Sequence, residues 1–519
     1  MGRIAIIGSG LAAISAASVL IQKGIKPVIL DYGENLPLET QKIVNKMASV
    51  DPQHWSAEEL ALISDNNTVK NKGALKKLSF GSDFFYGDSQ KVFLSERLSN
   101  PPFSLAYGGF ASGWGGAVLP ADDEDLNEWP INSNNLAKHY VDILSSVHFS
   151  AKDDDLTSHF PLHVKPSHAL KLTAGNEALL SAFRKHSKKF KTMSMLVGQA
   201  RLLTNALDTG CQYCGYCMSG CVYDSIYKPT KELERLINAG HIDYEPGVFV
   251  HYLTEIRDGV NVHFTDKNQK STTLTFDRVF LAAGAINSPK IILQSKRIYN
   301  KPIQLLSTNA FIAPLLSVKK NTLEWPHMNT QPGIFLEYKV PELSNHWIHT
   351  QLSTPNELVL KKLGLLDKKN ILLPFRKKMA QHLYVAVCNM HSNHAVKQTI
   401  SLAQNNLLIS GSENQEQAIH AVNRAKRKLF TITKKIGCYV LMPFVQRYGS
   451  YHLGGSLPMK HNPMAETDTN HLGMPKDWSR VHVIDSSVFT GLPGTTIGLL
   501  AMANSRRITH ETLETFKNT

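Results

Sequence analysis

The sequence predicts an α/β fold with a parallel sheet, and three consecutive features of its first 31 residues support this prediction. Residues 3–7 form a short, Ile-rich apolar run, which is typical of a strand buried on both faces. A glycine-containing turn follows and opens a stretch with small residues at helical spacing, which ends at Gly24. A second apolar run, residues 26–30, ends at Asp31. Strand, turn, helix and strand in this order are typical of a parallel βαβ unit.

The turn has the spacing of a dinucleotide-binding fingerprint, G-x-G-x-x-A, in the required setting. Gly8 allows the tight turn, Gly10 lets a pyrophosphate approach the backbone, and Ala13 keeps the helix close to the sheet. The helix N-terminus presents its positive end to the phosphates, and Asp31 stands where a carboxylate accepts hydrogen bonds from a ribose. A flavodoxin-like turn is the alternative, but it leaves Asp31 without a role. We therefore expect a Rossmann-like domain that binds a dinucleotide.

The length of 519 residues exceeds one ordinary core, so two or more domains are expected. The chain has 42% hydrophobic and 19% charged residues, which is typical of a soluble globular protein. No apolar run approaches the roughly 18–20 residues of a membrane helix. Because the first residues already form a core strand, no signal peptide is expected, and we predict a cytoplasmic protein.

The net charge of +13 has three explanations, which the sequence leaves open. They are an acidic substrate such as a nucleotide sugar or lipid phosphate, an anionic membrane surface, and a basic soluble enzyme with no such partner. A segment at residues 361–378 interleaves Lys and Arg with Leu. This pattern fits peripheral contact with the inner face of a membrane or a solvated helix face. Nucleic acid is not expected, because there is no recognised binding motif or dense basic tail.

Glycines are concentrated in one segment that follows a polar stretch. Residues 40–100 are polar and weakly periodic, so we expect an irregular excursion with short helices there. Five glycines then surround Trp114 within nine residues: Gly108, Gly109, Gly113, Gly115 and Gly116. Apolar flanks without Lys or Glu argue against a flexible loop, so this backbone is expected to press against a flat group.

The remaining elements follow from hydrophobic periodicity and turn signals, such as Asp258-Gly259 between two strands. The predicted helices are residues 133–144, 231–238 and 413–429, with a last helix from about residue 496. The predicted strands are residues 248–256, 260–264, 272–276, 278–282, 334–340, 384–390, 399–408 and 481–484. Residues 300–440 differ from the rest because they combine alternating strands, long polar connections and helices with Lys/Arg clusters. We assign most of a substrate domain to them.

Three segments together resemble the glucose–methanol–choline (GMC) family of flavin oxidoreductases. They are GSGLAA at 8–13, FLAAGAINSPKIILQS at 280–295, and YHLGGSLPM at 451–459 followed by VHVIDSSVFTGLPGTTIGLLAMANSRRI at 481–508. Their order and spacing span nearly the whole chain. The WGG stretch at 114–116 corresponds to the flavin-contacting loop of the family, although its sequence differs.

The resemblance implies a Rossmann-like FAD-binding domain built from separated segments, with an α+β substrate domain whose sheet covers the flavin. The expected segments are 1–125 for the first part of the FAD-binding domain (with the excursion at 40–100), 126–210 for a cap, 211–221 for a cysteine loop, 222–300 for the second FAD-binding part, 301–440 for the substrate domain, and 441–519 for the C-terminal FAD and active-site segment.

The resemblance also implies which residues hold FAD. The expected contacts are Gly8, Gly10, Ala13 and Asp31 at the ADP half, Trp114, Gly115 and Gly116 at the flavin loop, Val250 at the adenine, Gly284 beside the pyrophosphate, and Asp485, Ser486 and Thr496 at the ribityl chain and pyrimidine end. A helix N-terminus near Thr496 would stabilise negative charge on a reduced flavin.

His452 matches the active-site histidine of the family. The resemblance implies that it accepts the proton of a substrate hydroxyl while the carbinol hydrogen passes as hydride to flavin N5. Histidine suits this task because its ordinary pKa lies near neutrality. The family usually has a second His or Asn before a proline near here, but this sequence has Leu492. His391, His394 and Thr495 are the candidates to replace it.

Four of the six cysteines, Cys211, Cys214, Cys217 and Cys221, fall within eleven residues with the spacing CxxCxxCxxxC. In a cytoplasmic enzyme such a cluster indicates a metal site before disulfides. The spacing is that of a bacterial ferredoxin run without the final proline. Zinc, bare thiols and disulfides remain alternatives, although the spacing is tight for one tetrahedral ion. Some bacterial GMC proteins carry an iron–sulfur cluster near this part of the chain, so the resemblance favours a 3Fe-4S or 4Fe-4S cluster.

The resemblance therefore implies an FAD-dependent dehydrogenase that oxidises a CH–OH group of a small alcohol, in particular a sugar or glycoconjugate. Electrons would leave through the cluster to an acceptor protein or a quinone. Two alternatives stay open. One is a sterol or lipid alcohol dehydrogenase with the same chemistry. The other is a flavin electron-transfer subunit without substrate turnover, which the apolar Leu492 keeps in consideration.

Overall fold

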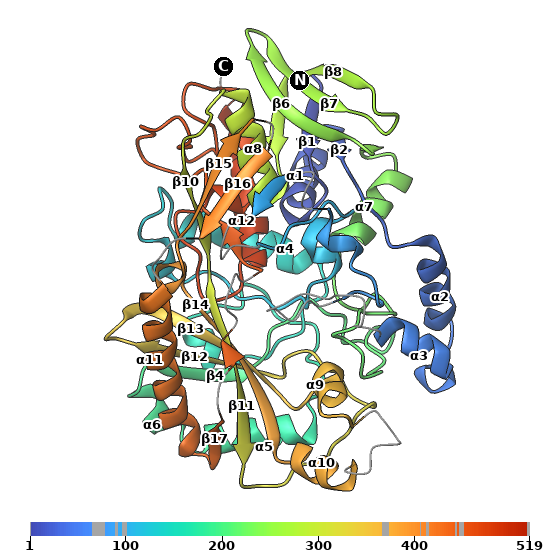
Figure 1. Ribbon diagram of the computed structural model, residues 1–519, viewed down its shortest axis with the longest axis vertical. Coiled ribbons are helices and arrows are strands. Elements are labelled where there is room, and N and C mark those ends of the chain that lie inside the picture. Colours follow the sequence, from blue (N-terminus) through green and yellow to red (C-terminus); the bar gives the residue numbers. More distant parts are fainter. Residues whose placement is uncertain are drawn as a thin grey trace.

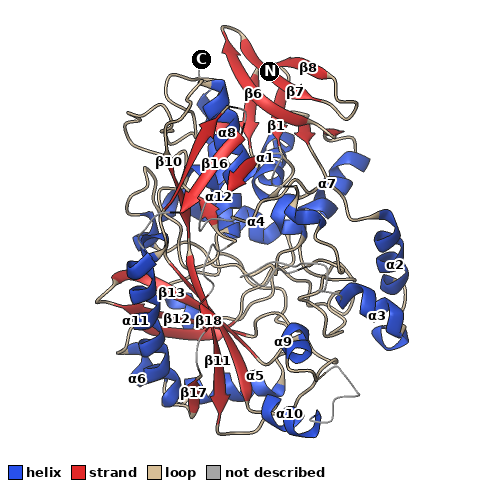
Figure 2. Cartoon of the chain, viewed as in Figure 1, coloured by secondary structure: helices blue, strands red, loops and turns tan. Residues whose placement is uncertain are grey.

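The computed structural model describes residues 2–64, 78–88, 92–95, 101–365, 373–404, 406–411, 415–441, 444–445 and 451–515. The chain forms two lobes (Figure 1). One lobe contains a parallel sheet and the other a large antiparallel sheet, and Figure 2 shows helices beside both. This mixed architecture confirms the predicted α/β fold class.

The parallel sheet draws its strands from widely separated segments, as predicted. The strand order is β20 (Val481–Val483), β9 (Arg278–Leu281), β1 (Ile4–Ile7), β2 (Val28–Asp31) and β5 (Asp243–Pro246). All four pairings are parallel. The first four strands of this order are buried throughout, which explains their mainly apolar sequences.

The predicted first helix is α1 (Leu11–Gln22), and Gly24 ends it in a left-handed conformation with φ of +74°. The small alanines of α1 allow close packing against the last helix, α12 (Gly498–Thr515). The Ser505 hydroxyl of α12 donates a hydrogen bond of 2.6 Å to the carbonyl of Ala12. The two ends of the chain therefore form one layer beside the parallel sheet.

The predicted hairpin and third strand are confirmed as an antiparallel meander. It consists of β6 (Phe249–Ile256), β7 (Gly259–Thr265) and β8 (Ser271–Phe276). The neighbouring helix α8 (Gly284–Ser295) follows β9 directly and packs against β6. This connection places the start of α8 at the carboxyl edge of the parallel sheet.

A second five-stranded sheet packs against α8, in the order β19 (Leu453–Gly454), β10 (Ile303–Ser307), β15 (Gln398–Ala403), β16 (Asn406–Gly411) and β3 (Phe93–Ser95). The prediction of one strand over residues 399–408 is wrong, because β15 and β16 pair antiparallel as a hairpin. Gln404 at the turn has φ of +53°. Asparagines follow at 405 and 406, and asparagine favours turns, so the sequence contained a turn signal that the prediction missed.

Most strands of the large sheet come from residues 301–440, the region predicted as the substrate domain, but β4 and β18 come from the segments predicted before and after it. The strands on its main path are β17 (Cys438–Val440), β11 (Asn309–Ser317), β14 (Leu383–Met390), β13 (Ser344–Ser353), β12 (Ile334–Val340) and β4 (Met195–Gln199), and β18 (Phe444–Val445) also pairs with β11. Helices α5 (Ala174–Arg184) and α11 (Gln415–Lys434) pack on one face. The opposite face contributes Phe335 and Trp347 to a second cluster.

The other helices agree with the predictions where these exist. They are α2 (Leu38–Ala48) and α3 (Ala57–Ser64) in the excursion, α4 (Ser133–Ser146), α6 (Ser187–Lys191), α7 (Pro229–Asn238), α9 (Glu357–Lys362) and α10 (Leu373–Ala380). Residues 366–372 of the basic segment lie outside the described residues. Among the helices that the structure describes, none has the length and apolar character needed to cross a membrane.

Candidate functional site

The glycines of the fingerprint serve two different purposes in the structure. Gly8 has φ of +100°, and a Cβ there would collide with the carbonyl oxygen of Ala282, so the turn fits tightly against β9. A Cβ on Gly10 would instead meet only the Gly108 carbonyl, 3.9 Å away. Gly284, at the start of α8, has no protein atom within 4 Å of its Cβ position. Gly10 and Gly284 thus face open space beside two helix N-termini, where a pyrophosphate can bind.

Asp31 lies at the end of β2 and is nearly buried, while Ala13 packs fully buried in the core beneath the turn. The Asp31 carboxylate accepts hydrogen bonds from the Ser9 hydroxyl (2.5 Å) and the Tyr244 hydroxyl (3.0 Å). Burial is the main cause that raises the pKa of Asp31 to about 6. The sequence did not single out Ser9 or Tyr244; Ser9 lies within the fingerprint, but Tyr244 comes from the distant strand β5.

The predicted adenine contact lies at the same edge of the sheet. The Val248 N–H donates a 2.9 Å hydrogen bond to the Asp31 carbonyl. This bond holds the start of β6 beside the end of β2. Val250, the second residue of β6, is therefore close to the carboxylate predicted to bind the ribose.

Asp485 and Ser486 use their side chains to join the C-terminal segment to the rest of the lobe. One Asp485 oxygen accepts hydrogen bonds from the Gly284 N–H (2.8 Å) and the Ser288 hydroxyl (2.5 Å). This carboxylate caps the start of α8, and burial raises its pKa. The Ser486 hydroxyl donates to the Leu453 carbonyl, 2.7 Å away, next to His452. Asp485 thus fixes the C-terminal segment to the start of α8, and Ser486 fixes it to the strand that follows His452.

The WGG segment lies against the start of α12. Trp114 donates its indole N–H to the Tyr227 carbonyl at 2.5 Å. A Cβ on Gly498, the first residue of α12, would lie 2.6 Å from the Trp114 ring. Gly115 has no protein atom within 4 Å of its Cβ position, whereas Gly116 has φ of +67° and packs against a backbone carbonyl. Of the two glycines, Gly115 is therefore the one that faces open space.

Two threonines precede α12. The Thr496 hydroxyl accepts a 2.8 Å hydrogen bond from the Leu119 N–H. The neighbouring Thr495 hydroxyl is fully buried and has no hydrogen-bond partner among the described residues. A buried hydroxyl without a partner beside a helix N-terminus is a suitable donor for a bound polar group.

His452 comes directly before β19, and its carbonyl accepts a hydrogen bond of 3.2 Å from the Thr308 N–H. Burial, followed by the nearby His349, lowers the pKa of His452 to about 4. The imidazole is therefore neutral at physiological pH. A neutral imidazole presents the lone pair that a general base requires.

Leu492 is a core residue in the structure, with 0% of its surface exposed. Its backbone exchanges two hydrogen bonds with Ser392, of 2.9 and 3.0 Å. These bonds place the Leu492 loop beside His391, and a Cβ on Gly491 would lie 3.0 Å from His391 Nε2. His391 therefore lies beside the loop in which Leu492 stands in place of the His or Asn that the resemblance leads us to expect. His394 is bound to the Ser344 hydroxyl instead, at 2.8 Å.

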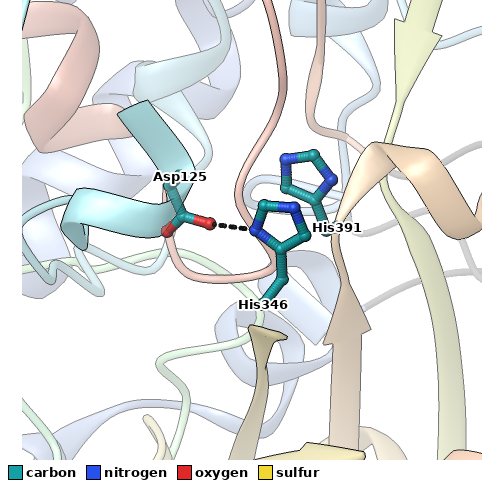
Figure 3. A group of neighbouring side chains, drawn as sticks. All are labelled: Asp125, His346 and His391. Atoms are coloured by element: carbon teal, nitrogen blue, oxygen red, sulfur yellow. Dashed lines mark hydrogen bonds and ion pairs between the residues drawn. The ribbon is translucent and has the colours of Figure 1, made fainter. Parts of the chain in front are cut away.

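His391 has two neighbours that the sequence did not indicate. Asp125, from the short 3-10 helix Asp123–Leu126, lies 3.1 Å from His346 Nδ1 (Figure 3). The rings of His346 and His391 stack, with centroids 3.7 Å apart and an interplanar angle of 3°. One ligand atom from each of the three residues lies within 4.8 Å of the others, so the group resembles a metal site.

The hydrogen bonds of this group disfavour a metal. The Asn393 N–H donates to His391 Nδ1 at 3.2 Å, which assigns the proton of the neutral ring to Nε2. Burial lowers the pKa of His391 to about 2, so the ring stays neutral. A metal-binding nitrogen must present a lone pair, whereas Nε2 presents an N–H. His391 is thus a hydrogen-bond donor at the edge of the Leu492 loop.

A second buried acid–histidine pair lies in the large sheet. Glu337 of β12 and His349 of β13 are both 0% exposed, with 2.6 Å between Glu337 Oε1 and His349 Nδ1. Neither residue was among the predicted site residues. A glutamate directly after the apolar run Ile334–Leu336 was the signal that could have found this pair.

The cysteine loop packs against the segment before β12. Three sulfurs accept N–H hydrogen bonds: Cys211 from the Asn329 side chain (3.4 Å), Cys217 from the Thr330 backbone (3.4 Å), and Cys221 from the Ser225 backbone (3.2 Å). All six cysteines are free thiols. Burial raises the pKa of Cys214 to about 12. Within the described residues, no three of the cluster sulfurs lie within 4.8 Å of one another, which is wider than one tetrahedral ion requires.

The fold is that of an α/β protein whose parallel sheet carries the G-x-G-x-x-A turn and whose second lobe is built on a large antiparallel sheet. Among solved structures, the chain is similar to pyridoxine 4-oxidase from Mesorbium loti, with a TM-score of 0.62 and 12% sequence identity. The likeness covers 98% of this chain and 98% of that one. No protein-family model and no curated protein matches the sequence. At this level of identity the likeness concerns the fold.

Proposed function

We propose that this protein is an FAD-dependent oxidoreductase of the GMC type that oxidises a CH–OH group of a small polar molecule. The observation that carries the proposal is a likeness in fold to pyridoxine 4-oxidase over 98% of the chain. The dinucleotide fingerprint at Gly8 to Ala13 supports it independently.

FAD fits the residues that face open space. Gly10 and Gly284 leave room for a pyrophosphate, and Gly115 leaves room beside Trp114 and the start of α12. Asp31 supplies a carboxylate for the ribose. A flavin bound there would accept a hydride from the substrate carbon.

His452 is the proposed base, because its lowered pKa keeps it ready to accept the hydroxyl proton. His391, with its Nε2–H at the Leu492 loop, is the proposed second polar contact for the substrate oxygen. The N-terminus of α12 would stabilise the negative charge that develops on the cofactor side. Leu492 itself takes no part in this chemistry.

The polar groups proposed at the site favour a polar substrate over a sterol. His391 presents its Nε2–H at the Leu492 loop, and the Thr495 hydroxyl before α12 is buried without a hydrogen-bond partner among the described residues. Such donors suit a sugar or another polyhydroxylated alcohol, whereas an apolar face would suit a sterol or lipid chain.

The test is anaerobic addition of a panel of sugars, pyridoxine, simple alcohols and sterols to the yellow protein, following flavin absorbance at about pH 7. Bleaching by polar alcohols but not by sterols is the expected result. FAD that is bound stoichiometrically and never bleached by any member would instead favour an electron-transfer subunit.

The cysteine loop is the proposed exit for electrons, as an iron–sulfur cluster. A chain of side chains leads to it from the WGG segment: Gln331 donates to the Gly115 carbonyl (2.7 Å), and Asn329 contacts both Gln331 (3.0 Å) and the Cys211 sulfur (3.4 Å). N–H donors to sulfur are typical of thiolates that hold iron. The sequence spacing CxxCxxCxxxC, which is that of a bacterial ferredoxin run, favours several irons over one zinc ion.

Cys214→Ser is expected to lose most of the iron while it keeps FAD, because the two sites use different segments. Iron, acid-labile sulfide and FAD are measured after anaerobic purification. Cys438→Ser is the matched control: Cys438 is buried in β17, outside the loop, and this variant should keep its iron. Stoichiometric zinc without iron in the parent protein would contradict the proposed cluster.

A further inference from the structure

Apolar side chains are exposed where two strands of the large sheet meet at its edge. Leu316 of β11 lies opposite Tyr439 of β17, so these two side chains share one face of the sheet. Val318 follows β11, and its N–H donates a 2.9 Å hydrogen bond to the Gly437 carbonyl. Leu316, Val318 and Tyr439 are 38%, 66% and 39% exposed. This edge of the sheet therefore presents apolar surface to the solvent.

Two helices extend this apolar surface. The Phe430 ring of α11 lies 6.4 Å from the Tyr439 ring. Beyond Val318, the Asn321 N–H donates a 2.7 Å hydrogen bond to the Gln381 carbonyl, directly after α10. One side of α10 adds two exposed apolar side chains a helical turn apart, Phe375 and Met379. We call these side chains the tip patch: Leu316, Val318, Phe375, Met379, Phe430 and Tyr439.

The tip patch lies at one end of the elongated molecule. Figure 1 shows β17, α10 and the end of β11 at the opposite end of the long axis from the meander β6–β8. A surface at such an end can touch a flat object while the rest of the molecule stays in water.

Exposed cations accompany the apolar side chains of the tip patch. They are Lys319 and Lys320 after β11, Lys377 and Lys378 of α10, and Arg427 and Lys434 of α11. Residues 303–323, 373–404 and 417–441, which supply the patch and these cations, contain no Asp or Glu. The segments that build this end of the molecule therefore contribute positive charge and no negative charge.

These cations also differ from many cations of the other lobe in having no ion pair with any described residue. In the other lobe, Lys26 pairs with Asp243 and Arg235 pairs with Glu232, each at 2.6 Å. Positive charge at the tip patch is thus left for an anionic surface outside the described part of the protein.

We propose that the tip patch docks the protein on an anionic membrane surface. The cations would lie beside the lipid phosphates, and the apolar side chains between them would enter the headgroup region. A membrane fits this end of the molecule better than an acidic protein does, because a stable protein partner needs about 800 Å² of matching surface on each side. Docking gives the net charge of +13 a partner, and it does not rest on the proposed reaction.

The test is co-sedimentation of the full-length protein with two kinds of vesicle. One kind is phosphatidylcholine alone, and the other contains about one-third anionic phosphatidylglycerol. We expect the protein to sediment with the anionic vesicles and to stay in the supernatant with the neutral ones. Binding should weaken as salt is raised, because salt screens the attraction between exposed charges.

Two variants separate the contributions of charge and apolar contact. Lys319→Gln combined with Lys320→Gln should weaken binding by about 25-fold at low salt, or about 5-fold for each cation. Phe375→Ser keeps the net charge and should weaken binding by about tenfold, at low and at high salt alike. Far-UV circular dichroism and FAD content should match the parent in both variants, because these side chains are exposed.

Lys267→Gln combined with Lys270→Gln is the matched control. These exposed lysines lie in the turn between β7 and β8, and their removal changes the net charge by the same amount. The control protein should sediment like the parent. An equal loss of binding in this control would make net charge the cause and overturn the proposed patch.

A parent protein that stays in the supernatant with anionic vesicles at low salt would also overturn the proposal, and an acidic protein would become the occupant to test. The measurement involves no substrate and no flavin reduction. A protein that docks on the vesicles but oxidises no alcohol would therefore refute the proposed function and keep the docking surface, and an active protein that never docks would do the reverse.

Discussion

His452→Ala is expected to slow flavin reduction by about 10²–10⁴-fold, the usual contribution of a positioned acid–base group. The reason is that alanine cannot accept the hydroxyl proton. FAD content should stay near that of the parent, because the fingerprint residues lie in other segments. Anaerobic stopped-flow measurement of flavin absorbance with a saturating alcohol gives the rate.

The parent enzyme should also lose flavin reduction at acid pH. His452 has a pKa lowered to about 4, so the neutral, active form predominates above that value and is protonated below it. The acid limb should therefore fall near pH 4 and should vanish in His452→Ala. His461→Ala, at an exposed histidine nearby, is the control and should react at the parental rate. A parental rate and pH profile in His452→Ala would move the role of base to His391.

Gly10→Val is expected to abolish FAD binding while the protein still folds. Gly10 has φ of −74°, which any residue adopts, and the nearest protein atom to its Cβ position is 3.9 Å away. The protein therefore has room for the side chain, but a pyrophosphate at the start of α1 does not. The FAD-to-protein absorbance ratio and the far-UV circular dichroism spectrum measure the two properties separately.

Gly24→Ala is the matched control in the same βαβ unit. Its φ of +74° makes alanine unfavourable by about 1 kcal/mol, but no atom lies within 4 Å of the Cβ position. This variant should lose some stability and keep its FAD. A folded Gly10→Val protein with a full complement of FAD would place the dinucleotide elsewhere.

The sequence predicted those parts of the fold that depend on neighbouring residues. The turn at Gly8, the helix end at Gly24 and the hairpin at Asp258-Gly259 are local, and each appears in the structure. The hairpin after Ala403 was missed although two asparagines mark its turn, because no glycine or proline interrupts the pattern there.

Which residues meet at the candidate site depends on how the strands pair. Local sequence patterns do not determine this pairing, so these contacts could not be predicted. Glu337 and His349 meet because β12 and β13 pair in one register, and a slip by one residue would turn them to opposite faces. Asp125 and His346 are 221 residues apart. Nothing in a single sequence fixes such a distance. Leu492 is part of the core, and the sequence does not indicate that its loop lies beside His391.

The interleaved parallel sheet has a consequence for how the protein is made. β1 leaves the ribosome well before its neighbour β9, which follows some 270 residues later, and β20 and α12 follow later still. Until then the alanine-rich side of α1 has no α12 to cover it, and the emerging chain presents apolar surface that favours aggregation. The proposed dinucleotide site is completed only when these later segments have been made. If the proposed function holds, FAD should therefore bind only after α12 has been synthesised.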